Sequence, residues 1–346
     1  MDKNFHKLIQ KEKTILLPDI GTFFNDDTSL AIEMINKLHA YNVEVIKGEI
    51  LHDPNICLDY DQNEFYYDKS QKKFIAENYR KLMTRKTVDL NSYEKIFEHA
   101  KSLDKVLVLS IYDTVGVDFA LNIKCDVIKV ASSNITNIPL IKYMSKFDLP
   151  IILDTGHSTL EEIARAINIL NDNDFFDIFI QHSPLAPPVP VEEQNLNFMV
   201  NLGKTFGLPY GLSDHHDGDE MLYAATALGA SIVEKGVTPE KYLADQDCAH
   251  AMFIDDIPEI LKRIKNISIS LGNGTRYLRR DREKYKSRMC IYATQDIKNG
   301  EKISEEKISF AMPFVGIGVE DIDNVIGRKL SKDVKKGEPL KKDFLI

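Results

Sequence analysis

The sequence of 346 residues contains no tryptophan, only four cysteines and no long hydrophobic run. No apolar stretch approaches the roughly 20 residues that a membrane-spanning helix needs, so we expect no membrane partner. The cysteines, Cys57, Cys125, Cys248 and Cys290, form no CxxC pair. Their spacing argues against a zinc knuckle and against a disulfide framework, and it predicts reduced, structural thiols. The first 13 residues are polar and carry both charge signs, so we expect no secretory signal and a cytoplasmic location.

Positive charge is also in short supply. The chain has 44 Lys and Arg residues against 53 Asp and Glu residues, a formal net charge of -9. This balance argues against a nucleic acid as the main partner. An acidic protein that binds an anionic small molecule must therefore do so with lysines placed at the binding site. Hydrophobic residues make up 43% and charged residues 28%, which is typical of a globular protein with one or two domains.

Eight β-rich runs, nearly all separated by helical patterns, occupy the first three quarters of the chain. They are residues 14–20, 43–47, 105–111, 126–131, 149–154, 176–181, 208–213 and 230–235. The runs are apolar on both sides of the strand alternation, as parallel strands covered by helices must be. Helices are predicted over residues 28–38 and 257–269, and Ser158 with Glu161 forms a possible capping box for the helix after the fifth run. The pattern predicts an α/β fold, a TIM (β/α)8 barrel over residues 1–271.

Three segments depart from this repeat. Residues 48–102 are too long for a simple βα connection, and we interpret them as a loop over the barrel mouth or as a peripheral decoration, with a helix predicted over residues 70–83. Residues 272–288 begin with glycines and become strongly basic, which is typical of a linker. Residues 289–346 contain short strands, glycine turns and many lysines, and they predict a small β-rich C-terminal domain.

Polar side chains recur where the predicted strands end, and parallel barrel strands bring such ends to one mouth. Lys47 and Lys129 are notable because a buried lysine without a partner is costly, whereas a lysine in a mouth can hold a phosphate or carboxylate. The alternative is structural pairing, of Lys47 with Asp19 or Glu49 and of Lys129 with Asp154. The serines beside them, which can bind phosphate, favour the anion site. Asp19 is a candidate base or water-orienting group.

The stretch Tyr210–Gly218 concentrates titratable residues at one strand end. His215 is a candidate metal ligand or acid-base group, and His216, His182 and His157 are weaker candidates. The alternative is a polar loop in which Asp217 caps the helix that follows. The rest of the chain decides between these two interpretations.

Taken in order, these motifs resemble the sialic acid synthase family, the phosphoenolpyruvate-dependent nonulosonate synthases. The similarity is carried by the following segments: Pro18–Gly21, Val45–Lys47, Ile128–Ser132, Asp154–Gly156, Gly211–His215 and Ala227–Lys235. The C-terminal residues resemble the antifreeze-like SAF domain in residues 293–301, 313–317, 326–329 and 336–338. The resemblance extends over nearly the whole chain, and the order and spacing of the motifs carry it.

This resemblance implies an enzyme that condenses phosphoenolpyruvate with the open-chain aldehyde of an N-acyl hexosamine, giving a nonulosonic acid and phosphate for surface glycan biosynthesis. The residues implied in substrate binding are Lys47, Ser110, Lys129, Ser132, Ser213 and Asp247. Asp19 and His215 would be catalytic, with Asp19 acting on the water. The resemblance also implies a divalent metal, manganese or magnesium, on His215, and a homodimer in which the SAF domain of a partner subunit reaches over the barrel.

Several positions depart from the family pattern. Gly236 stands where the family has its second metal-ligand histidine, so His216 or His182 would have to replace it. Met312 stands where the SAF arginine is expected, and Pro184 and Ala186 stand where the family has an asparagine and a tyrosine. The phosphoenolpyruvate half of the site is thus better kept than the metal and sugar half. Two alternatives stay open: a barrel enzyme of another type, such as an aldolase or lyase, and a non-catalytic relative that binds a sugar or an anion.

Overall fold

The computed structural model describes residues 4–172, 175, 177–184, 188–240, 246–275 and 287–346. The chain forms two compact units, residues 1–272 and residues 273–346. Within the described residues, no helix has both the length and the apolar character needed to cross a membrane. The four cysteines are all buried and unbonded to one another. Most of the predicted linker falls outside the described residues.

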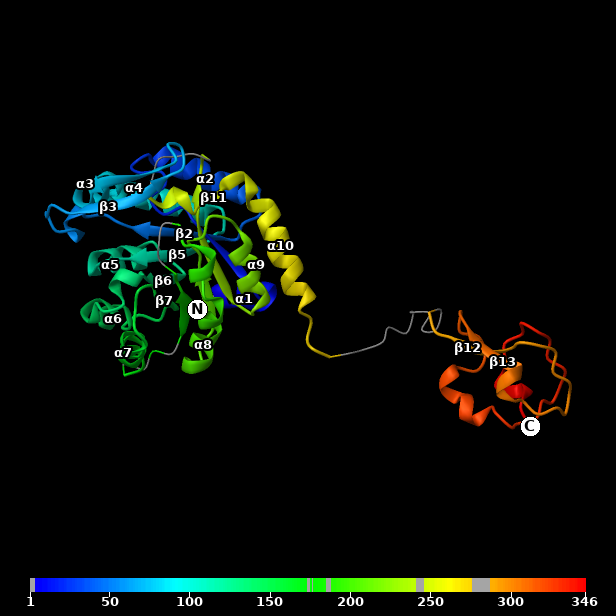
Figure 1. Ribbon diagram of the computed structural model, residues 1–346. Helices are drawn as coiled ribbons and strands as arrows, with labels where there is room; N and C mark the ends of the chain where they lie inside the picture. The colour runs from blue at the N-terminus through cyan, green and yellow to red at the C-terminus, as the bar shows by residue number, and fades with distance from the viewer. Residues whose placement is uncertain (1–3, 173–174, 176, 185–187, 241–245, 276–286) are drawn as a thin grey trace. The chain divides into compact units, whose positions relative to one another are not determined.

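Eight parallel strands close into a barrel, as the sequence predicted (Figure 1). In spatial order they are β1 (Ile15–Asp19), β2 (Val45–Ile50), β5 (Val106–Ile111), β6 (Val127–Val130), β7 (Ile151–Asp154), β8 (Ile178–His182), β9 (Tyr210–Ser213) and β10 (Ile232–Thr238). Pairing of β1 with β10 closes the barrel. A short strand, β11 (Met252–Phe253), pairs in parallel with the C-terminal end of β10.

Helices cover the outside of the barrel because their apolar faces pack against the strands. They are α2 (Thr28–Ala40), α4 (Leu90–Ser102), α5 (Thr114–Asn122), α6 (Ile138–Met144), α7 (Leu160–Asn171), α8 (Leu196–Phe206), α9 (Glu220–Ala227) and α10 (Ile257–Ser270). The first and the last of these agree with the predicted helices 28–38 and 257–269 within one or two residues.

The lower part of the barrel interior is purely hydrocarbon. A helix that the sequence analysis did not predict, α1 (Asn4–Glu12), places Phe5 and Leu8 against this layer. The layer itself contains one or two side chains from most strands: Leu17, Val45, Val106, Val108, Val127, Ile152, Phe179 and Ile232. Phe5 is fully buried, so α1 closes the amino-terminal end of the barrel and leaves the carboxyl end as the mouth.

The long segment between β2 and β5 contains a β-hairpin, and the predicted helix over residues 70–83 is wrong. Strands β3 (Asn63–Asp68) and β4 (Lys73–Asn78) pair antiparallel, and the helix α3 (Tyr79–Lys86) begins only afterwards. The reason is local, because the Asp68 carboxylate accepts hydrogen bonds from the backbone N–H groups of Ser70 and Gln71 and so forms a turn. Lys72 adopts a left-handed conformation, which reverses the chain.

Two predicted helix caps also need correction. The capping box of α7 is formed by Thr159 and Glu162, one residue later than the Ser158–Glu161 pair that the sequence suggested. The residue at the N-terminus of α9 is Asp219, not Asp217, and its side chain makes no capping hydrogen bond. For α7 the spacing of the polar pair was right and the register was wrong, whereas for α9 the predicted cap is absent.

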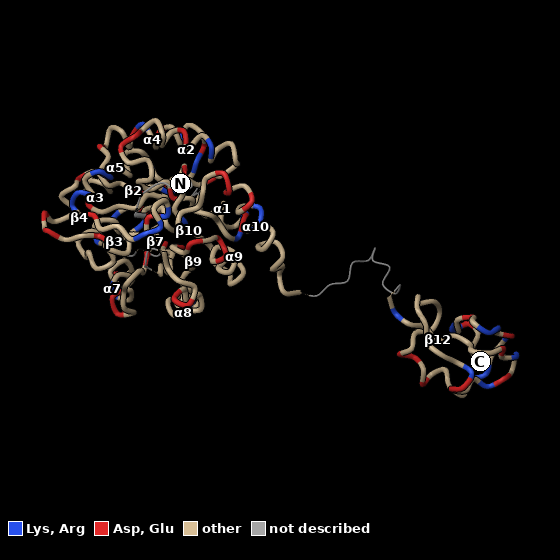
Figure 2. The backbone as a smooth tube through the Cα atoms, turned by 45° about the horizontal axis from the view of Figure 1, so that its top comes forward, with Lys and Arg blue, Asp and Glu red and all other residues tan. Residues whose placement is uncertain are grey.

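The C-terminal unit is a small β-rich module. Strands β12 (Cys290–Ala293) and β13 (Ile308–Ala311) form its only named sheet in the described residues, and aliphatic side chains fill its core. Gly316 is needed there because a Cβ atom at this position would lie 2.1 Å from the carbonyl oxygen of Leu340. Lys and Arg residues and Asp and Glu residues are interspersed along both units (Figure 2).

Candidate active site

The carboxyl ends of the barrel strands surround a cavity of about 170 Å³. Strand register brings functional residues to one level, because Asp19 lies beside Lys47 on one side and beside Gly236 on the other. Ser110 likewise lies beside Lys129. All the residues predicted to bind substrate or act in catalysis line this cavity: Asp19, Lys47, Ser110, Lys129, Ser132, Ser213, His215 and Asp247.

Lys47 is almost fully enclosed, with 1% of its surface exposed. Its Nζ donates to the Asp19 carboxylate and to Glu49 Oε1 at 3.0 Å, and it lies 3.6 Å from Glu234 Oε1. Glu49 follows Lys47 by two residues on β2, so both side chains face the barrel interior. The ion pairs that the sequence offered as the alternative for Lys47 are therefore present.

Lys129 is paired in the same way. Its Nζ lies 2.6 Å from Glu234 Oε1 and 2.9 Å from Asp154 Oδ2. Burial alone would raise the pKa of Glu234, but Lys129 and Lys47 outweigh burial and lower that pKa to about 2. Despite their burial, the pKa values of both lysines are raised by the surrounding carboxylates. Both lysines are thus held in the charged form.

Asp19 behaves differently from Glu234. Burial is the main cause that raises the pKa of Asp19 to about 7, with Glu49 and Glu234 adding to the effect and Lys47 opposing it. A carboxyl group that titrates near neutral pH can exchange protons with a reacting group, which is the property that a general base needs.

Several polar atoms that line the cavity have no partner among the described residues. They include the buried hydroxyl oxygens of Ser110 and Ser183, the second carboxylate oxygen of Glu234 and Nδ1 of His250. A buried polar atom without a partner costs about 1–3 kcal/mol. Since four such atoms meet in one cavity, the arrangement fits a polar ligand that would supply the missing hydrogen bonds.

The histidines of the mouth divide into two groups. His215 lines the cavity, and its Nδ1 lies 3.1 Å from the carbonyl oxygen of Pro184, so this nitrogen donates and Nε2 carries the lone pair. His216 and His182 are held by backbone carbonyls of Val189 and Gln194, at 3.0 and 2.8 Å. Neither of them belongs to the cavity lining, so their positions give no support to the prediction that one replaces a metal ligand.

The ring of Phe23 fills the space beside Gly236, where the implied metal would have its second ligand. A Cβ atom at Gly236 would lie 2.7 Å from Cζ of Phe23, whose ring is buried against this strand. Among the described residues, no group of three or more His, Cys, Asp or Glu side chains is arranged to hold a metal. The residues present therefore do not fit the two-histidine site that the resemblance implied.

A buried ion pair fixes the backbone around His215. Lys235 Nζ lies 2.7 Å from Asp214 Oδ2 and 2.6 Å from the carbonyl oxygen of His216. The other carboxylate oxygen of Asp214 accepts from the backbone N–H of His216 at 2.9 Å. Lys235 thus connects β10 to the loop after β9 on both sides of His215.

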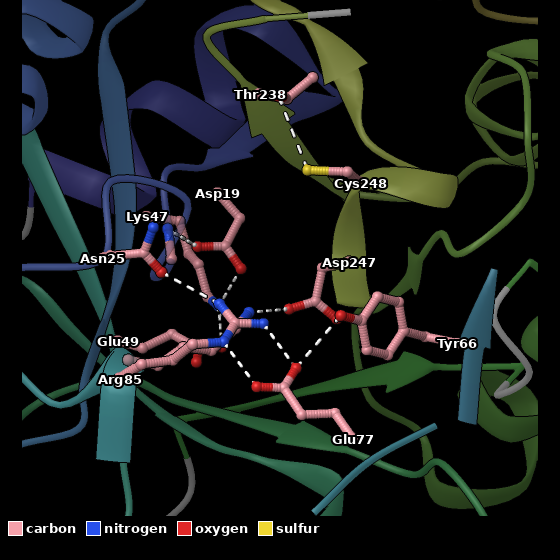
Figure 3. A network of polar contacts seen from close by, with 12 residues as sticks. Asp19, Asn25, Lys47, Glu49, Tyr66, Glu77, Arg85, Thr238, Asp247 and Cys248 are labelled. Carbon is pink, nitrogen blue, oxygen red and sulfur yellow. Dashed lines mark hydrogen bonds and ion pairs between the residues drawn. The ribbon is translucent and has the colours of Figure 1, made fainter. Parts of the chain in front are cut away.

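The segment between β2 and β5 is tied to the mouth by a second network (Figure 3). Arg85, on α3, forms two contacts of 3.0 Å with Glu77 on β4, and Figure 3 shows its guanidinium group directed toward Asp19 and Asp247 as well. Lys86 Nζ lies 3.1 Å from Asp247 Oδ2. The segment is therefore part of the mouth and not a peripheral decoration.

Comparison with known proteins agrees with this architecture. The NeuB family model matches residues 34–276, and the SAF domain model matches residues 288–346. The chain belongs to the NeuB family. The chain is 28% identical over 333 residues to N,N'-diacetyllegionaminic acid synthase of Campylobacter jejuni, covering 94% of this chain and 98% of that protein. It is 27% identical over 331 residues to pseudaminic acid synthase of Helicobacter pylori, covering 95% and 96%.

A solved structure shares the fold of this NeuB family member. The N-acetylneuraminic acid synthetase of Leptospira borgpetersenii, determined in complex with citrate, superposes with a TM-score of 0.68 at 20% identity, covering 78% of this chain and 89% of that one. The sequence-based assignment to a synthase family is confirmed, and so are the barrel fold and the enzyme class.

Some residues of this NeuB site escaped the sequence analysis. Glu49 could have been found, because strand alternation places it on the same face as Lys47. Glu234 lies at the end of the predicted strand 230–235, and no role was predicted for it. Phe23, Arg85 and His250 carry no local signal, because their positions at the mouth depend on loops and on the hairpin segment. Ala186 lies outside the described residues.

Proposed function

We propose that this enzyme condenses phosphoenolpyruvate with the open-chain form of an N-acyl hexosamine-type aldose, yielding a nonulosonic acid and phosphate. The observation that most directly supports this proposal is a cavity lined by two buried, charged lysines and by serine hydroxyls that have no partner among the described residues. The names of the relatives, legionaminic and pseudaminic acid synthases, support the product class. A cytoplasmic setting fits enzymes that use such soluble precursors.

The buried ion pairs define how phosphoenolpyruvate would bind. Its phosphate and carboxylate would take over contacts that Lys47 and Lys129 now make with Asp19, Glu234 and Asp154. Such an exchange is favourable because charge-assisted hydrogen bonds to phosphate are among the strong ones. Ser110 and Ser183 would donate their free hydroxyl groups to the same anion.

The proposed reaction forms one carbon-carbon bond and breaks one carbon-oxygen bond. C3 of phosphoenolpyruvate attacks the aldehyde carbon, whose oxygen becomes an alkoxide and takes up a proton. Water adds at C2, and Asp19 accepts the proton that the water loses. Phosphate then leaves with the electrons of its bond to C2, and the new hydroxyl group at C2 gives up its proton to the phosphate, so that C2 becomes the ketone of the product. We derive no step through a metal, because Phe23 fills the place of its second ligand.

Ion pairing argues against Lys47 or Lys129 as the Schiff-base lysine of an aldolase. A nucleophilic lysine must lose its proton, which requires a lowered pKa. Here the carboxylates around Lys47 and Lys129 raise both pKa values. The same lysines suit the binding of an anion.

Phosphate release from phosphoenolpyruvate with a panel of N-acyl hexoses tests the proposal. We expect release with at least one acceptor and none without acceptor. Lys129→Met is expected to abolish release, while Lys262→Met, on the exposed face of α10, leaves it unchanged. If no acceptor supports release, and phosphoenolpyruvate also fails to raise the melting temperature, the proposal is wrong. A ligand at 100 times its Kd adds about 2.7 kcal/mol of stability, which is readily detected.

The homodimer is likewise a proposal. Light scattering would show a particle of twice the chain mass if it forms, and a particle of the single chain mass would contradict it.

A further inference from the structure

The cavity contains a second histidine that the proposed reaction has not used. His250 lies between η4 (Gln246–Ala249) and β11, it is 6% exposed, and its ring lines the cavity. The centre of its ring lies 4.8 Å from that of His215, at an interplanar angle of 72°. Its Nδ1 is buried and has no hydrogen-bond partner among the described residues.

A buried imidazole nitrogen without a partner is costly, and a ligand that bonds to it recovers the cost. A neutral imidazole has one donor and one acceptor nitrogen, so a ligand in the cavity could bond to it.

The acceptor's aldehyde oxygen is the atom of the proposed reaction that gains negative charge. Since Phe23 excludes a ligand at position 236, some other group must polarise this carbonyl. A neutral histidine can do so by donating a hydrogen bond to the oxygen where charge develops.

We propose that His250 is a catalytic residue that donates a hydrogen bond to the aldehyde oxygen of the acceptor, in place of a two-histidine metal site. The proposal rests on the proposed condensation. His250 donates the hydrogen bond without losing its proton. The alkoxide takes its proton from solvent, and the proton that the attacking water loses balances it. His215, whose Nε2 carries a lone pair, would accept a hydrogen bond from a hydroxyl group of the acceptor.

Three variants of the full-length protein test this role. His250→Ala is expected to lower kcat by about 100-fold or more, as loss of one oxyanion donor does. His250→Gln retains an N–H donor and should recover a good part of that loss. Neither variant should change the Kd for phosphoenolpyruvate, measured by calorimetry, because Lys47 and Lys129 are untouched. His99→Ala, a histidine on α4 that bonds Asn36 outside the barrel, is the control and should match the wild type.

Metal content gives an independent readout. After treatment with EDTA and removal of the chelator, the wild-type enzyme should bind no manganese in calorimetry and should keep its kcat. The double variant Phe23→Ala with Gly236→His should gain manganese binding, because the ring that blocks the ligand position is gone.

The following results would overturn the role proposed for His250. Loss of kcat on chelation with recovery by manganese would overturn the proposal, and so would stoichiometric manganese binding by the wild type that His215→Ala abolishes. An unchanged kcat in His250→Ala would overturn it as well. If the wild type binds phosphoenolpyruvate yet turns over no aldose, the proposed condensation fails instead, and the manganese titration still reports on Phe23.

Discussion

The ring of Phe23 occupies the space that any side chain at Gly236 would need. The distance of 2.7 Å from the ring edge to a Cβ atom at this position is shorter than real Cβ contacts. The two residues come from the first loop and the last strand of the barrel, and β1 and β10 are neighbours. The Phe23 ring therefore explains why position 236 has no side chain, and the glycine explains how the ring can lie there.

Substitution of Gly236 by alanine should destabilise the protein because it forces the Phe23 ring to move. We expect a loss of about 1–3 kcal/mol, the usual cost of overpacking. Urea denaturation of Gly236→Ala would measure it. In the double variant with Phe23→Ala, adding the Cβ at position 236 should cost less than it does in the wild type. An equal cost in both backgrounds would show that the two residues do not interact.

Removal of Lys129 should affect stability and binding separately. Lys129→Met leaves Asp154 buried without its cation and leaves Glu234 with Lys47 alone, at 3.6 Å. Breaking a buried pair costs about 3–5 kcal/mol. Lys129→Met with Glu234→Gln should recover part of the stability but none of the affinity for phosphoenolpyruvate. Chemical denaturation and calorimetry on the two variants distinguish these effects. Recovery of binding in the double variant would mean that Lys129 does not hold the anion.

Affinity for phosphoenolpyruvate should fall as the pH rises through neutrality. Asp19, with a pKa of about 7, is neutral below that pH and adds a negative charge above it. Because the ionised form, which is the base of the proposed reaction, binds the anion less tightly than the neutral form, Kd should rise above pH 7 by less than about tenfold per pH unit. Asp19→Asn should remove this dependence, and the difference between the two proteins corrects for titration of the ligand itself. Parallel pH profiles for both would contradict the assignment.

The same carboxyl group makes a prediction for stability. The folded protein keeps a proton on Asp19 that the unfolded chain loses near pH 4, so this residue's contribution to stability decreases from about pH 4 to pH 7. Thermal unfolding of wild type and Asp19→Asn across this range measures the difference. We expect the stability of the wild type relative to the variant to decline with rising pH, whereas an increase would reverse the sign of the pKa shift.

Lys235 should prove to be a positioning residue. Lys235→Met removes the ion pair with Asp214 and the hydrogen bond to the His216 carbonyl, so the loop that carries His215 is released. We expect a loss of about 3–5 kcal/mol of stability and faster amide exchange over residues 213–216, detected by mass spectrometry. Lys265→Met is the matched control, because this lysine lies on the exposed face of α10. Unchanged exchange in Lys235→Met would show that the loop is held by other contacts.

The sequence predicts the barrel well because its signals are local. Each strand is a run of apolar residues, and parallel strands bring their carboxyl ends together, so Lys47, Lys129 and Ser213 could be placed in one mouth. The helix predicted over residues 70–83 covers strand β4, because the Asp68 turn that reverses the chain before it depends on side-chain geometry. The position of Phe23 against Gly236 and of His250 beside His215 depends on loops from distant parts of the chain. No pattern along the sequence encodes such contacts.

The hydrocarbon layer that α1 closes has a consequence for how this site can change. Below the charged residues of the mouth lies an apolar layer of Leu17, Val108, Ile152 and their neighbours, which is buried and takes no part in chemistry. A glycine at position 236, with the Phe23 ring packed against it, does not alter this layer. The apolar layer and the charged network therefore lie at different levels of the barrel, and a substitution at the mouth leaves the contacts of the apolar layer in place.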